Sequence, residues 1–279
     1  MIFVSLKCQM GNQLFQYAFG VAIAKKLHSI WFPFLNSSYY PFKLEYFELD
    51  PFTRFLFANQ KIAHFYTRVC RNVIRRVPIK QITDLEWQPL SQLQNCCYYD
   101  GFFQSEKYFE IYDAIIKKRF RIKKHYQYAF KEKYEHFFSN NKIIVIHIRR
   151  TDYTVAEYES LGGPGVALPT SYYFKALQNI QNVQEYAIIF VGDDLTSIQK
   201  DFGHIANARF EKNDPIIDFQ LIQHADISII ANSTFAWWAA YLTQNENSRI
   251  IAPEYWLGYK LKKTYPAGIR TDKFEWLAF

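Results

Sequence analysis

A pair of adjacent arginines gives the clearest indication of chemistry in this sequence. In the segment IIVIHIRRTDY, an apolar run typical of a buried parallel strand leads directly to Arg149, Arg150 and Asp152. Two guanidinium groups at a strand end form a fork that suits phosphate oxygens. The alternatives are a surface ion pair between one arginine and Asp152, and a packed core position for His147. The segment therefore predicts an anion site where a strand ends.

A second polar junction lies further along the chain. In ANSTFAWWAAYL, Asn232, Ser233 and Thr234 separate an apolar run from an apolar helix. The hydroxyl groups and the first backbone N–H groups of such a helix can hold an anion. Plain helix capping is the alternative, and the two roles are compatible. Together with the arginines, this junction predicts a site for a diphosphate, as in transfer from a nucleotide diphosphate conjugate.

Paired carboxylates raise the question of a metal. Asp193 and Asp194 follow the apolar run of FVGDD, and acidic pairs can ligate hard cations. The chain contains no D-x-D, and the arginines already supply positive charge for a phosphate. We therefore expect no metal.

The N-terminal region repeats the pattern of strand, polar loop and helix. The run IFVSL is followed by CQMGNQLFQYAFG, in which Gly11, Asn12 and Gln13 stand at the junction. We expect Gly11 to permit the turn and Asn12 to cap the start of the helix.

The arrangement of these segments predicts an α/β protein. From residue 142 onward, apolar strands alternate with helical segments, which is typical of a doubly wound parallel sheet. The first half is less regular, and a boundary near Asn140 gives domains 1–140 and 141–279. Ligands of open α/β sheets lie beyond the carboxyl ends of the strands, where the motifs gather.

Composition limits the classes of partner and compartment. Lys and Arg number 33 against 26 Asp and Glu, giving a formal charge of +7, with basic clusters at residues 68–80 and 117–124. One interpretation of the first cluster is a solvated face of a surface helix. The alternative is that the cluster is attracted to an anionic membrane surface or to a phosphorylated substrate. Nucleic acid is not expected, since no recognisable binding module accompanies the charge.

The lack of recognisable targeting signals predicts a cytoplasmic protein. We find neither a signal peptide nor an apolar stretch long enough to span a bilayer. None of the four cysteines forms a CxxC pair, which favours free thiols in a reducing compartment.

Three segments together resemble a known enzyme family. GNQLFQYAFG, HIRRTDY and DFQLIQHADISIIANSTFAWWAAYL are similar to motifs of the α-1,2-fucosyltransferases of glycosyltransferase family 11, in the same order. The resemblance implies a GT-B-like architecture of two facing Rossmann-like domains with a cleft between them. It also implies GDP-fucose as donor, no divalent metal, and inversion at the anomeric carbon.

The resemblance assigns roles to individual residues. Arg149 and Arg150 would neutralise the pyrophosphate of the leaving GDP, and Asp218 would lie near the guanine base. The other residues expected near the nucleotide are His147, Asn232, Ser233, Thr234, Gly11 and Gln13. Without the resemblance, Asp218 is a solvated carboxylate on a helix face.

Inversion by direct displacement needs a group that takes the proton of the acceptor hydroxyl. Asp152 and Glu157 are the candidates. Asn12 and Gln13 are expected to project into the cleft, near the pyrophosphate and the incoming acceptor. The family usually has a Gly-Gly pair where this chain has Cys8 and Gln9. Side chains at those positions limit the φ values of the loop.

The sequence thus predicts an inverting galactoside α-1,2-fucosyltransferase. Its acceptor would be a galactose-terminated oligosaccharide or a lipid-linked glycan, and the basic helix would allow peripheral contact with the inner face of an anionic membrane. The alternatives are a fucosyltransferase of another linkage and a non-catalytic glycan- or nucleotide-binding protein of the same fold.

Overall fold

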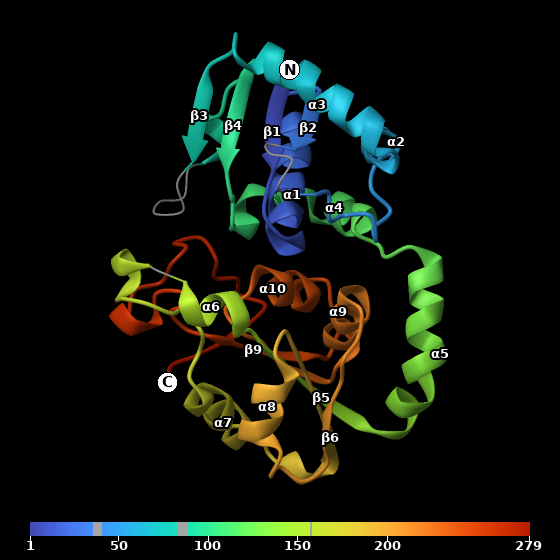
Figure 1. Cartoon of the computed structure of the whole chain (residues 1–279), viewed down its shortest axis with the longest axis vertical. Helices are drawn as coiled ribbons and strands as arrows, with labels where there is room; N and C mark the ends of the chain where they lie inside the picture. The colour runs from blue at the N-terminus through green and yellow to red at the C-terminus, as the bar shows by residue number, and fades with distance from the viewer. Residues whose placement is uncertain (36–40, 83–88, 157) are drawn as a thin grey trace. The chain divides into compact units, whose positions relative to one another are not determined.

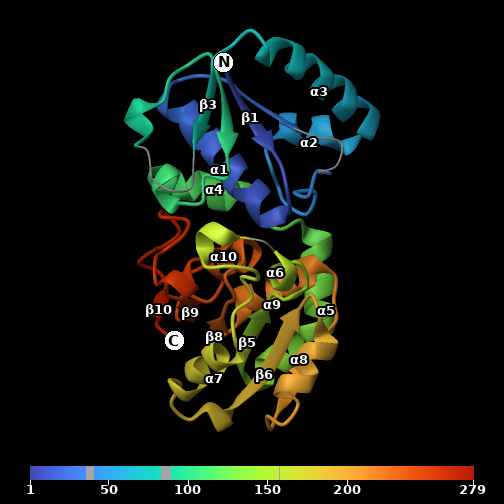
Figure 2. The same ribbon diagram turned by 60° about the vertical axis from the view of Figure 1, so that its left-hand side comes forward.

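The computed structural model describes residues 1–35, 41–82, 89–156 and 158–279. These residues form two compact units, shown in Figures 1 and 2. Unit 1 comprises Met1–Lys123 with Pro266–Arg270, and unit 2 comprises Lys124–Tyr265 with Thr271–Phe279.

The boundary between the units lies earlier than the one predicted near Asn140. Helix α5 (Lys124–Asn140) belongs to unit 2. Its Phe130 ring stacks on His224 of α9 with centroids 4.7 Å apart, and Figure 1 shows the two helices side by side. Gln220 of α9 also donates to the backbone carbonyl of Tyr126 at 3.2 Å. The predicted domains 1–140 and 141–279 therefore differ from the observed units by this helix and by Pro266–Arg270, which belongs to unit 1.

Unit 1 is built on a parallel sheet of strand order β2-β1-β4-β3. Its strands are β1 (Ile2–Leu6), β2 (Trp31–Leu35), β3 (Ile79–Ile82) and β4 (Cys97–Gly101). Its α-helices are α1 (Met10–Lys26), α2 (Pro51–Ala58), α3 (Gln60–Ile74) and α4 (Asp113–Arg119), with 3₁₀ turns η1 (Leu90–Gln92), η2 (Glu106–Tyr108) and η3 (Glu110–Tyr112).

The first helix begins earlier than the sequence suggested. Helix α1 starts at Met10, and its N-cap Gln9 makes no side-chain capping bond. Asn12 is therefore inside the helix, and the prediction that it caps the start is wrong. Gly11 is also helical, and Cys8, with φ 64°, takes the left-handed conformation at the turn. The turn thus occurs at the two positions where the resemblance implies a Gly-Gly pair, and its left-handed φ is one that glycine adopts without strain.

Unit 2 is built on a parallel sheet of strand order β10-β9-β8-β5-β6-β7. Its strands are β5 (Lys142–Ile148), β6 (Tyr186–Gly192), β7 (Ala208–Phe210), β8 (Ile227–Ile229), β9 (Arg249–Pro253) and β10 (Glu275–Leu277). Besides α5 and α9 (Pro215–His224), its α-helices are α6 (Thr151–Val155), α7 (Thr170–Gln178), α8 (Leu195–Phe202) and α10 (Thr234–Tyr241). Its 3₁₀ turns are η4 (Glu159–Leu161), η5 (Val183–Glu185) and η6 (Tyr259–Leu261).

Helices cover both faces of this sheet, as the apolar runs predict for parallel strands. Alternate residues such as Ile146 of β5 and Phe190 of β6 share one core with α7 and α8. On the other face, Ser228 of β8 donates to the Ile222 carbonyl of α9 at 3.1 Å, and His147 lies against Phe235 of α10. The chain moves outward from β5 to β6 and β7, then returns to the opposite side of β5 to form β8.

Two neighbouring tyrosines of α7 differ in the hydrogen bonding of their buried hydroxyl groups. Both are fully buried, but only the Tyr172 hydroxyl is bonded, lying 2.9 Å from the Ile230 carbonyl and 3.2 Å from that of Ile251. The Tyr173 hydroxyl has no hydrogen-bond partner among the described residues. We expect Tyr172→Phe to lower the free energy of unfolding by about 1–2 kcal/mol, because buried carbonyls lose a donor.

The matched variant Tyr173→Phe should leave that free energy unchanged or raise it, since it removes an unsatisfied hydroxyl. Denaturant unfolding of the two variants checks this difference. Equal losses in both would contradict the assigned hydrogen bonds.

Candidate functional site

The strand order places a topological switch between β5 and β8. The chain leaves these neighbouring strands in different directions, and ligands of open α/β sheets bind in the crevice that results. Arg149 and Arg150 follow β5, and Asn232 and Ser233 follow β8. The Ala231 N–H donates to the His147 carbonyl at 3.1 Å and joins the two strand ends. The structure therefore brings the two predicted anion-binding motifs together.

The Asp193 carboxylate connects the end of β6 to the end of β5. It accepts hydrogen bonds from the Arg150 backbone N–H at 2.8 Å and from the Thr151 hydroxyl at 2.6 Å. Its Oδ2 also lies 3.2 Å from Nε of Arg149. Asp194 has another task, since it is the N-cap of α8 and accepts from the Ser197 N–H at 3.2 Å. The sequence showed both carboxylates but assigned neither of these roles.

The two arginines point to different partners. The Arg150 guanidinium donates to Ser197 Oγ at 2.7 Å and pairs with Asp201 Oδ2 at 2.6 Å, so it is attached to α8. The closest approach of Arg149 to Asp152 is through Nε, 2.8 Å from Oδ1, and the same atom faces Asp193; its Cζ also lies 5.6 Å from the centre of the Tyr153 ring. Among the described residues, no hydrogen bond engages its terminal Nη groups. Arg149 thus keeps the forked end of its guanidinium available for a ligand.

Two buried polar atoms lack partners on either side of the switch. His147 Nδ1 and Asn232 Oδ1 have no hydrogen-bond partner within the described ranges, although Asn232 Nδ2 donates to the Val166 carbonyl at 2.7 Å. Burial, together with the nearby Arg149 charge, lowers the pKa of His147 to about 4, so the ring is neutral at pH 7. Buried polar atoms are normally satisfied, so these two mark a place that a ligand can complete.

The start of α10 adds uncompensated donors to the same place. Its N-cap Ser233 makes no side-chain capping bond, and Trp237 is the first residue whose N–H bonds back to the Ser233 carbonyl. The N–H groups of the first helical turn therefore remain available, at the positive end of the helix dipole. Thr234 is the first helical residue and is partly exposed. This geometry suits a phosphate.

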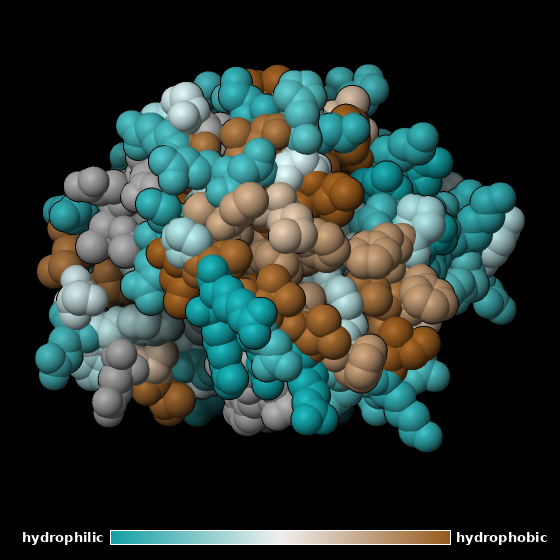
Figure 3. All heavy atoms as spheres, turned by 90° about the horizontal axis from the view of Figure 1, so that it is seen from above, coloured by the Kyte–Doolittle hydropathy of each residue, from teal (hydrophilic) through white to brown (hydrophobic). Residues whose placement is uncertain are grey.

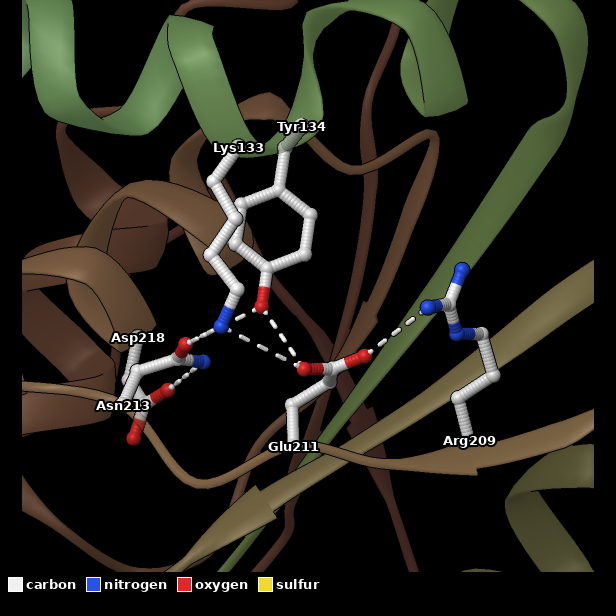
Figure 4. Close-up of polar contacts among 6 residues, drawn as sticks. All are labelled: Lys133, Tyr134, Arg209, Glu211, Asn213 and Asp218. Carbon is white, nitrogen blue, oxygen red and sulfur yellow. Dashed lines mark hydrogen bonds and ion pairs between the residues drawn. The ribbon is translucent and has the colours of Figure 1, made fainter.

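A second polar cluster surrounds Asp218 on α9 (Figure 4). The Asn213 amide donates to Asp218 Oδ1 at 2.9 Å. The carbonyl oxygen of the same amide faces the Tyr134 hydroxyl at 3.1 Å and also contacts the ammonium group of Lys133. Because both contacts involve donors, the amide is fixed with its NH₂ group toward Asp218.

The Glu211 carboxylate binds the same two donors, the Tyr134 hydroxyl and the Lys133 ammonium group. The Tyr134 hydroxyl lies 2.9 Å from Glu211 Oε2, and the Lys133 ammonium lies 3.6 Å from the same atom. Arg209 pairs with the other carboxylate oxygen of Glu211 at 3.3 Å. Figure 4 shows the resulting chain of contacts from β7 to α9. Sequence reasoning missed Lys133 and Tyr134, because their helix was placed in the first domain.

The Asp218 carboxyl is unusually basic. Burial raises its pKa to about 7, against the opposing effects of the Asn213 hydrogen bond and the Lys133 charge, and the charges of Glu211 and Asp214 raise it further. The group is therefore poised between its neutral and charged forms near neutral pH. A partly buried carboxyl with this pKa is a typical functional-site candidate.

The remaining predicted residues lie elsewhere. Gly11, Asn12 and Gln13 belong to unit 1, where Asn12 Oδ1 accepts from Gln104 at 2.9 Å. Buried Gln13 donates to the backbone carbonyls of Cys8 and Pro41. Glu157 lies outside the described residues. Asp152 remains a candidate base, with a side chain that is 58% exposed.

The described ranges contain no group of three or more His, Cys, Asp or Glu side chains that could hold a metal ion. In the same ranges, none of the helices combines the length and apolar character required of a transmembrane span.

The raised pKa of Asp218 makes a prediction about stability. An ordinary Asp has a pKa of 3.8, so the folded state binds this proton more tightly than the unfolded state does. The free energy of unfolding therefore falls as the pH rises from about 4 to about 7. Above that range, the full cost of ionising Asp218 in the folded state applies. We expect Asp218→Asn to raise the free energy of unfolding at pH 8 by on the order of 2 kcal/mol.

Denaturant unfolding at pH 8 and pH 5 checks this prediction, and the gain should be smaller at pH 5. The matched control is Asp272→Asn, an exposed position of unit 2 that is not among the charges acting on Asp218, where no gain is expected. A loss of stability in Asp218→Asn at pH 8 would show that the charged carboxylate stabilises the fold.

Comparison with known proteins shows the family and the fold. The family model described as "Glycosyl transferase family 11" matches residues 86–263. Two relatives from Escherichia coli are similar in sequence. The O-antigen biosynthesis glycosyltransferase WbnK is 36% identical over 116 residues, spanning 40% of this chain and 38% of that protein. An alpha-1,2-colitosyltransferase is 26% identical over 265 residues, spanning 88% of this chain and 89% of that protein.

Solved structures show the same architecture. NodZ alpha-1,6-fucosyltransferase co-crystallized with GDP gives a TM-score of 0.54 at 12% identity, covering 90% of this chain and 94% of that one. POFUT1 in complex with GDP gives a TM-score of 0.51 at 13% identity, and the match covers 90% of this chain and 96% of that one. The α/β, GT-B-like fold predicted from the sequence is confirmed. With more than half of its length matched by the family model, the chain belongs to glycosyl transferase family 11.

Proposed function

We propose that this chain transfers L-fucose from GDP-fucose to the 2-hydroxyl of a galactose in a glycan, with inversion and without a metal. One observation carries the proposal. The switch between β5 and β8 brings together an available guanidinium fork, an uncapped helix start and two unsatisfied buried polar atoms. These groups complement a diphosphate, which is the leaving part of a nucleotide-sugar donor.

Arg149 and the start of α10 would bind the diphosphate. The Nη groups of Arg149 are free to reach phosphate oxygens, while Asp193 and Asp152 fix its Nε. The hydroxyls of Ser233 and Thr234 and the first N–H groups of α10 would contact the same phosphates. Negative charge develops there as the bond to fucose breaks, and preorganised positive groups stabilise such charge most effectively in a water-poor site.

Asp218 would bind the guanine base. An ionised carboxylate accepts hydrogen bonds from two neighbouring N–H groups on one edge of guanine, and Asn213 leaves Asp218 Oδ2 available for this. Asp218 follows β7, which is separated from β5 by β6. Two inter-strand spacings amount to about 10 Å, a separation suited to a base and its diphosphate.

The acceptor hydroxyl requires a base. Asp152 stays a candidate because its carboxylate is exposed and adjoins Arg149, and Glu157 stays a prediction. The role expected of Asn12 in unit 1 also stays a prediction.

The α-1,2 linkage draws support from the relative named alpha-1,2-colitosyltransferase, which aligns with most of this chain. The same relative supplies a second candidate function, transfer of colitose with the same linkage. A non-catalytic protein that binds the nucleotide is the alternative from another class.

The deciding assay offers GDP-fucose or GDP-colitose with a terminal β-galactoside, with and without EDTA, and determines the product linkage by NMR. We expect an α-1,2-fucosylated product that EDTA does not reduce. Preference for GDP-colitose would assign the second function, and tight GDP binding without any transfer would favour the non-catalytic protein. Loss of activity in EDTA would contradict metal independence.

The unequal environments of the two arginines predict different consequences of their removal. We expect Arg149→Ala to reduce kcat by about 10²–10³-fold, because charge at the leaving diphosphate is no longer neutralised. Its melting temperature should change little. Arg150→Ala should instead lower the free energy of unfolding by about 1 kcal/mol, because it breaks the contacts with α8.

Steady-state kinetics and thermal unfolding of both variants test this assignment. Asp201→Asn is the matched control, since it weakens the same contact from α8 and should reproduce the stability loss of Arg150→Ala. A much larger loss of kcat in Arg150→Ala than in Arg149→Ala would reverse the two roles.

A further inference from the structure

Helices α2 and α3 of unit 1 turn large apolar side chains toward solvent. On α3, Ile62, Phe65 and Val69 recur at intervals of three and four residues, so they share one side of the helix. We call this set, with two phenylalanines of α2, the α2–α3 face. Its members and their exposed fractions are Phe52 (45%), Phe55 (64%), Ile62 (36%), Phe65 (70%) and Val69 (45%). Figure 3 looks onto the side of unit 1 that carries α3, and apolar groups form a broad band there.

This face is not the side by which α3 packs in unit 1. Ala63, Thr67 and Cys70 are the buried residues of the helix. Cys70 packs in one cluster with Phe34 and Tyr98 of the sheet. Since that inner side already anchors α3, the outward apolar side chains are a second hydrophobic surface. Such a surface is typical of an interaction site.

A row of basic residues borders the apolar side of α3. Lys61, Arg68 and Arg75 are spaced by seven residues, which is close to two helical turns, so they line up along the helix. All three are exposed. Residues 51–83 contain no Asp or Glu, and their basic residues are Arg54, Lys61, Arg68, Arg71, Arg75, Arg76 and Lys80. Arg54 is paired with Glu48 at 2.9 Å.

We propose that the α2–α3 face docks on an anionic phospholipid bilayer, with α3 lying in the plane of the interface. A helix with apolar residues on one side and Lys or Arg beside them is suited to that position. Phe55, Phe65 and Val69 would enter the acyl boundary, while Arg68 and Arg75 would remain among the lipid phosphates.

The charge distribution selects this occupant over a second copy of the chain. Pairing two α2–α3 faces about a twofold axis would place like-charged basic rows against one another, which is unfavourable. A nucleic acid would satisfy the arginines but leave the exposed phenylalanine and valine side chains without an apolar partner. A lipid surface accommodates both sets of side chains at once.

Vesicle flotation of the full chain tests the docking. We expect binding to vesicles that contain phosphatidylglycerol, little binding to phosphatidylcholine alone, and weaker binding as salt increases. The variant Phe65→Ser/Val69→Ser should reduce the partition coefficient at least tenfold. Arg68→Gln/Arg75→Gln should reduce it by about fivefold for each arginine.

Ile111→Ser is the matched control, because Ile111 is 76% exposed in unit 1 but lies outside this face. It should bind vesicles as the unchanged protein does. Unaltered melting temperatures establish that the variants are folded. Equal binding to neutral and anionic vesicles, or unchanged binding after Phe65→Ser/Val69→Ser, would overturn the docking. So would a dimer that this double substitution dissociates, or nucleic-acid binding in place of lipid binding. No donor is needed in these assays, so they are independent of the proposed transferase activity.

Discussion

The position of the Asp193 carboxylate determines how the candidate site is built. Its two oxygens bind the end of β5 through the Arg150 N–H, the Thr151 hydroxyl and Nε of Arg149. The close register of β5 and β6, with Ile148 opposite Gly192, brings the carboxylate within reach of all three groups. Within the described residues, no hydrogen bond engages the Nη groups of Arg149, so they remain available. Arg150 is directed to α8 instead.

The second half of the site depends on a helix that the sequence did not connect with it. Tyr134 and Lys133 of α5 fix the Asn213 amide, which in turn positions the partly buried Asp218 carboxyl. Burial that raises the pKa of Asp218 to about 7 opposes ionisation and thereby reduces stability at neutral pH. A carboxyl whose ionisation costs stability is a candidate for ligand binding, since perturbed pKa values are frequent at functional sites.

The parts of the fold governed by local patterns could be predicted from the sequence. The apolar run of β5 and the polar junction before α10 identified two strand ends, and the parallel sheet brings them together. The different contacts of Arg149 and Arg150 could not be predicted, because Ser197 and Asp201 lie far along the chain from them. The start of α1 was misplaced because a left-handed Cys8, rather than Gly11, makes the turn. The contacts of α5 are likewise long-range, so its assignment to unit 2 had no local signal.

The central claim is that the edge of one sheet binds the base of GDP at Asp218 and its diphosphate at Arg149. Calorimetric titration with GDP and with IDP, which lacks the 2-amino group of guanine, tests it most directly. The unchanged protein should prefer GDP by at least about tenfold, as expected when a buried hydrogen-bond partner is lost. Asp218→Asn should abolish the preference for GDP. Arg149→Ala should weaken the binding of both nucleotides and leave the preference for GDP unchanged. Equal affinities for GDP and IDP in the unchanged protein, or a preference that survives Asp218→Asn, would contradict the account.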